Sequence, residues 1–125
     1  MSKANIELLI PNAITALESN QDFANGNIDS VYQGYISSFG VGVVQVGLLP
    51  TLAYFESESS KGERKIISDL VRDTLNIEVE SLLRYAVEYS DAESLENEIK
   101  DASVALKLSM RLFDLGNGGK SWVQT

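Results

Sequence analysis

The chain of 125 residues contains no cysteine and no histidine. Without cysteine there is no disulfide bond and no thiolate metal site. Without histidine there is no imidazole to act as a general base, a metal ligand or a member of a Ser-His-Asp triad. Only carboxylates, lysine and tyrosine remain for acid–base or nucleophilic chemistry. These absences remove most enzyme mechanisms, and we expect no cofactor and no metal.

Residues 30–55 contain no charged side chain, which raises the question of a membrane span. Polar residues, four glycines and Pro50 interrupt this stretch, so that no block of 18 apolar residues exists. Near the N-terminus, Glu7 and Pro11 interrupt the only apolar run that could belong to an export signal. We therefore expect no membrane contact and a cytoplasmic protein.

The composition that remains is that of an ordinary globular domain, with 44% hydrophobic and 22% charged residues. Apolar residues recur at helical spacing through most of the chain. The fold class predicted is all-α: a compact single-domain bundle of five to six helices over residues 1–125, with about 116–125 as a flexible tail. The stripes that indicate the later helices are Ile66, Ile67, Leu70, Val71 and Leu75; Val79, Leu82, Leu83, Ala86 and Val87; and Leu95, Ile99, Ala102, Leu106, Met110 and Phe113.

Helix boundaries are less well defined than helix positions in the first half of the chain. An apolar stripe over 6–19 contains Pro11, so this helix either begins near Pro11 or is kinked there. A second helix, capped by Asp29 or Ser30, carries the stripe Tyr32, Ile36, Phe39, Val43 and Val46. Its last part, residues 40–46, has poor helix propensity and is also compatible with a strand, but the continuous stripe favours a helix.

Turn residues predict where the other helices begin and end. Gly47 is expected to terminate the second helix, and Pro50 to lie in the first turn of a third. Ser90 and Glu93 form a capping-box pattern that would open the longest helix, and Gly116 is expected to close it.

Two patterns suggest chemistry but have simpler explanations. Residues 116–121 resemble a phosphate-binding loop, but the first glycine of that motif is replaced by Asp114 and too few residues follow to form its helix. Glu93, Glu96, Glu98 and Asp101 have a spacing compatible with a magnesium site, yet such ligands usually converge from several elements. We interpret these four carboxylates as a solvated helix face.

The net charge of −8 is unevenly distributed. Residues 78–101 hold two basic and eight acidic side chains, whereas residues 61–77 and 102–125 are each slightly basic. Two basic stripes are predicted at helical spacing: Lys61, Arg64, Lys65 and Arg72, and then Lys100, Lys107 and Arg111. Such stripes are either ordinary solubilising residues or contacts for phosphates or acidic partners.

Residues 35–40 (YISSFG) and 47–55 (GLLPTLAYF) give the chain a resemblance to a known family. The chain is similar to the small subunit of the Cmr complex, the type III-B CRISPR effector. Arg111-Leu112-Phe113 matches the basic residue beside an aromatic in the final helix of that family. The resemblance covers nearly the whole chain, and residues 35–55 are its most specific part.

The resemblance implies a non-catalytic subunit that stacks with copies of itself in a filament beside the guide RNA. Its partners would be the backbone and large Cmr subunits and the duplex of guide and target RNA, contacted mainly on the target strand. The RNA-binding residues implied are Lys61, Arg64, Lys65, Lys107 and Arg111. A helical protein–protein interaction module, or a homo-oligomer without nucleic acid, is the alternative.

Overall fold

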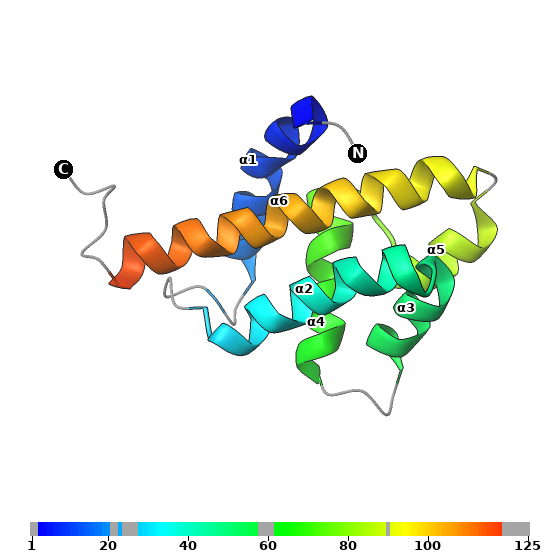
Figure 1. Ribbon diagram of the computed structural model, residues 1–125, viewed down its shortest axis with the longest axis horizontal. Coiled ribbons are helices and arrows are strands. Elements are labelled where there is room, and N and C mark those ends of the chain that lie inside the picture. Colours follow the sequence, from blue (N-terminus) through cyan, green and yellow to red (C-terminus); the bar gives the residue numbers. More distant parts are fainter. Residues whose placement is uncertain (1–2, 21–22, 24–27, 58–61, 90, 119–125) are drawn as a thin grey trace.

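The computed structural model describes residues 3–20, 23, 28–57, 62–89 and 91–118, and these form six α-helices and no strand (Figure 1). The predicted all-α bundle is therefore confirmed. The helices are α1 (Lys3–Ser19), α2 (Ser30–Gln45), α3 (Leu48–Glu56), α4 (Gly62–Thr74), α5 (Leu82–Glu88) and α6 (Ala92–Gly118).

The longest helix, α6, runs along the length of the molecule and packs against α1, α2 and α4 (Figure 1). Its predicted apolar stripe forms the centre of the core, because Leu95, Ile99, Ala102, Leu106 and Met110 are all buried. From α2, Ile36, Phe39 and Val43 pack into the same core. The rings of Phe39 and Phe55 meet edge to face with their centroids 5.1 Å apart, which joins α2 to α3.

The segment for which a strand was the alternative is helical, since α2 continues through Gly40 to Gln45. Asp29 caps it, as predicted, by accepting a hydrogen bond from the Val31 amide at 3.0 Å. The prediction that Val46 belongs to the buried stripe is wrong: α2 has ended, and Val46 is 68% exposed. Gly47 takes φ +118°, a conformation that favours glycine, and its amide donates to the Gly42 carbonyl, which ends α2.

Helix α1 begins at Lys3 and contains Pro11 within it, so the alternative in which the helix begins near Pro11 is excluded. Two other predicted boundaries differ from the structure. At the start of α6, Asp91 accepts a hydrogen bond from the Ser94 amide at 3.1 Å and fills the capping role assigned to Ser90, which lies outside the described residues. At its other end α6 continues past Gly116 to Gly118; the rest of the predicted tail, 119–125, is not among the described residues.

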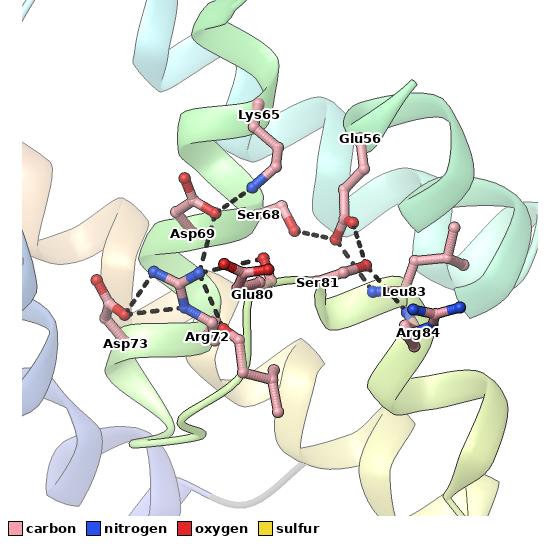
Figure 2. A network of polar contacts seen from close by, with 11 residues as sticks. Glu56, Lys65, Ser68, Asp69, Arg72, Asp73, Glu80, Ser81, Leu83 and Arg84 are labelled. Atoms are coloured by element: carbon pink, nitrogen blue, oxygen red, sulfur yellow. Dashed lines mark hydrogen bonds and ion pairs between the residues drawn. The ribbon is translucent and has the colours of Figure 1, made fainter. Parts of the chain in front are cut away.

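Figure 2 shows how Glu56, at the end of α3, holds three elements together. Its carboxylate accepts hydrogen bonds from the Ser68 hydroxyl of α4 at 2.6 Å and from the Ser81 hydroxyl at 2.7 Å. It also accepts one from the Leu83 amide, in the first turn of α5, at 3.0 Å. Since hydrogen bonds to a charged acceptor are the stronger kind, this carboxylate fixes the position of α5.

Candidate nucleic-acid interface

Arg64, in the first turns of α4, is held between two aromatic rings. Its guanidinium carbon lies 5.2 Å from the ring centroid of Tyr35 on α2 and 5.1 Å from that of Tyr54 on α3. Both distances are within the range of cation–π attraction. Arg64 is half-buried and Tyr54 is 56% exposed, so the cluster is open to solvent on the Tyr54 side. The arrangement orients a planar cation at the surface without neutralising its charge.

The other basic residues of this stripe that the structure describes differ from Arg64. Lys61 lies outside the described residues. The Lys65 ammonium is 2.6 Å from Oδ1 of Asp69, and Arg72 reaches the same carboxylate at 3.3 Å (Figure 2). Arg72 also pairs with Asp73 and donates to the backbone carbonyl of Val79, so it supports the segment before α5. Lys65 and Arg72 thus pair with carboxylates of their own helix, whereas Arg64 contacts the two tyrosines.

On α6 the structure places Lys100, Lys107 and Arg111 on one side of the helix, as their spacing predicts. Lys100 pairs with Glu96 at 3.3 Å. Among the side chains that the structure describes, which on α6 end at Leu112, no carboxylate lies within ion-pair distance of Lys107 or Arg111. Arg111 is exposed and Lys107 is half-buried. Within this set of side chains, neither of the two has a compensating carboxylate.

A groove with a volume of about 370 Å³ separates part of α2 from α6. Its walls include Val41 and Val44 of α2 and Val104 of α6, while Lys100 and Lys107 also line it. Val41 is 52% and Val44 is 66% exposed. Lys107 thus lies against an apolar surface and not on an open basic one.

The two basic regions do not form one continuous surface. Tyr35, which contacts Arg64, is nine residues before Val44 on α2, which places the two on opposite sides of that helix. In Figure 1 the first turn of α4 lies below α2, whereas α6 lies above it. Helix α2 therefore separates Arg64 from Lys107.

The acidic face predicted on α6 is only partly solvated. Glu93 and Glu98 are exposed, and Glu96 pairs with Lys100. The prediction is wrong for Asp101, which is 3% exposed and whose Oδ1 atom has no hydrogen-bond partner. Helix α1 packs against α6, and its residue Asn5 lines the same small surface hollow as Asp101. Spacing along α6 alone cannot show such a neighbour from another helix. Within the described part of the chain, no three acidic side chains are grouped so as to hold a metal ion.

Sequence reasoning missed both the aromatic partners of Arg64 and the groove. The sequence did contain a signal for the groove: Val41 and Val44 are apolar residues that lie outside the apolar stripe of α2 and are not needed for its core-facing side. The contact of Tyr35 and Tyr54 with Arg64 had no signal, because three different helices contribute to it. None of the helices, over the residues described, is both long and apolar enough to cross a membrane.

Comparison with known proteins identifies one family. The model of the family described as CRISPR-associated protein (Cas_Cmr5) matches residues 12–109, which is most of the chain and includes helices α2 to α5 entirely. Neither the curated proteins nor the solved structures include a match.

Proposed function

The chain belongs to the Cas_Cmr5 family of CRISPR-associated proteins, and on this basis we propose that it acts as a non-catalytic structural subunit within the Cmr ribonucleoprotein. The match over residues 12–109 is the observation that carries the proposal. In the proposed role, several copies stack beside the backbone subunits that hold the guide RNA. Cleavage belongs to other subunits, in keeping with a chain that has no histidine or cysteine.

The chemistry of the surface supports contact with the target RNA through Arg64 and Arg111. Both carry charge that no described carboxylate compensates, and the tyrosines orient the Arg64 guanidinium for a phosphate. Lys65 would contribute less, because Asp69 already neutralises much of its charge. Lys61, which precedes α4, is proposed on the sequence pattern alone.

A single copy should bind RNA weakly. Its net charge is −8, and its two basic regions lie on different sides of α2. Electrostatic affinity for RNA depends on how many phosphates are neutralised together. Copies held side by side in a complex would present several such arginines along one duplex, and weak contacts then add through effective concentration.

The test is to purify this chain through an affinity tag after co-expression with the other Cmr subunits and a guide RNA. Recovery of the larger subunits and the guide RNA in one complex is expected. The complex is then prepared with a double variant, Arg64→Ala and Arg111→Ala, and target-RNA affinity is measured against salt concentration. Each phosphate that the variant no longer neutralises should lower the slope of log K against log salt by about 0.7–0.9.

Arg84→Ala is the matched control, because Arg84 is exposed and lies outside both basic regions. This control should leave affinity and slope unchanged. Recovery of the tagged chain alone would contradict membership of the complex. Unchanged affinity in the double variant would instead contradict only the RNA contact.

A further inference from the structure

We propose that the groove between α2 and α6 is the docking site for an acidic amphipathic helix of another polypeptide in the same assembly. The inference rests on the proposed function, since it presupposes that the chain works inside a complex. Beyond the proposed function, it specifies the kind of partner segment that the groove binds, and it assigns Lys107 to contact with protein.

The shape of the groove fits the side chains of a helix. Its floor contains small residues where α2 and α6 come close: Gly40 of α2 lies opposite Ser103 of α6, and a Cβ at Gly40 would be 3.9 Å from the Ser103 Cβ. Larger apolar walls, formed by Val41, Val44 and Val104, rise on either side of this point. Small residues between larger ones create a hollow that can accept an apolar side chain, as in other helix-in-groove contacts.

Exposure of the apolar walls of the groove to water is unfavourable in free energy. Val41 and Val44 are 52% and 66% exposed although α2 has a complete buried face on its other side. Covering them removes apolar surface from water and is favourable in proportion to the area covered. An RNA backbone offers charged phosphates and polar sugars, which gain little from valine walls, so the floor and walls favour a protein occupant.

The charges at the groove select an acidic occupant. Its lining contains Lys100 and Lys107 and no acidic residue, in a chain whose net charge is −8. Lys107 has no ion-pair partner among the described residues, and Lys100 has only Glu96 of its own helix. Lys107 follows Lys100 by seven positions along α6, so the two lie about 10.5 Å apart on one side of it. A helix with carboxylates two turns apart and apolar residues between them would pair with both.

The experiment uses the purified, reconstituted Cmr complex containing this chain with the photoreactive amino acid p-benzoylphenylalanine at position 44. The control carries it at position 46, because Val46 is as exposed as Val44, at 68% against 66%, but does not line the groove. We expect position 44, and not position 46, to crosslink to a helical segment of another polypeptide that contains acidic residues. Crosslinks to RNA, crosslinks to a segment without acidic residues, or no crosslink would overturn the proposal.

Substitutions provide a second readout that needs no crosslink. Lys107→Glu should weaken retention of this chain in the complex about tenfold or more, since a negative charge at this position would repel the carboxylate with which Lys107 pairs. Arg84→Glu, the same change of sign at an exposed position outside the groove, should leave retention unchanged. Both variants should keep the circular dichroism of the native protein.

The two proposals fail in different ways. If the native chain and the Lys107→Glu variant enter the complex equally well, the groove proposal is overturned and the proposed function stands. A native chain that never enters the complex overturns both.

Discussion

Gly42 of α2 lies directly against Thr51 of α3. A Cβ atom built on Gly42 would be 2.8 Å from the Thr51 hydroxyl oxygen and 3.2 Å from its methyl carbon. Thr51 is buried, so it has little room to move away. The close approach of α2 and α3 therefore requires a residue without a side chain at this position.

From this contact we expect Gly42→Ala to destabilise the protein by about 1–3 kcal/mol, the usual cost of overpacking. Gly40→Ala is the matched control two residues earlier on the same helix. There a Cβ would make an ordinary 3.9 Å contact with Ser103, and alanine should stabilise the helix by up to about 1 kcal/mol. Urea unfolding followed by circular dichroism measures both. Equal effects of the two substitutions would show that Thr51 can move aside.

Glu56 is expected to be the carboxylate whose removal destabilises the chain most. Glu56→Ala removes the acceptor of hydrogen bonds from Ser68, Ser81 and the Leu83 amide. We predict a loss of about 2–4 kcal/mol in the free energy of unfolding, because charged acceptors are worth more than neutral ones. Glu98→Ala, on the exposed face of α6, should change it by less than about 0.5 kcal/mol. A small effect of Glu56→Ala would indicate that α5 is held mainly by its apolar contacts.

Asp101 is expected to lower the free energy of unfolding of the native protein. Its side chain is buried and its Oδ1 atom has no partner, so an ionised carboxylate there is poorly solvated. Asp101→Asn, which keeps the shape and removes the charge, is expected to raise the free energy of unfolding by about 1 kcal/mol. Glu98→Gln, one turn earlier and exposed, is the control and should have no effect. Destabilisation by Asp101→Asn would mean that a positive group or a bound cation compensates the carboxylate.

The contact of Arg64 with the two tyrosines leads to a prediction about RNA binding that concerns the shape of the cation as well as its charge. Arg64→Lys keeps the positive charge but loses the planar group stacked between Tyr35 and Tyr54. In the assembled complex we expect the salt dependence of target binding to stay the same while affinity falls about two- to fivefold, the equivalent of a cation–π contact of about 0.5–1 kcal/mol. An affinity equal to that of the native complex would mean that the rings do not position the cation.

The purified protein should not cleave nucleic acid. Incubated alone with RNA or DNA and magnesium or manganese, it is expected to leave both substrates intact on denaturing gels. A metal-dependent nuclease activity that Glu96→Ala or Asp101→Ala abolishes would contradict the non-catalytic role.

The positions of the helices and much of the core follow from the amino-acid sequence. The spacing of Leu95, Ile99, Ala102 and Leu106 specifies a buried helix face, because only a helix brings these residues to one side. The helical spacing of apolar residues also predicted correctly that α2 continues past Gly40 and Gly42. The family follows from the sequence too, since residues 35–55 lie within the matched range. The ion pair of Lys65 with Asp69 was available from their i, i+4 spacing as well.

Which of these side chains are available to a partner depends on how the helices pack against one another. Arg64 meets Tyr35 and Tyr54 because three helices converge there, and Asp101 lies beside Asn5 of α1, which packs against α6. Lys107 proved to lie at an apolar groove because α2 brings Val41 and Val44 beside it. Helical periodicity reports which side of one helix a residue occupies. What lies on that side depends on helix packing, which brings together residues far apart in the sequence.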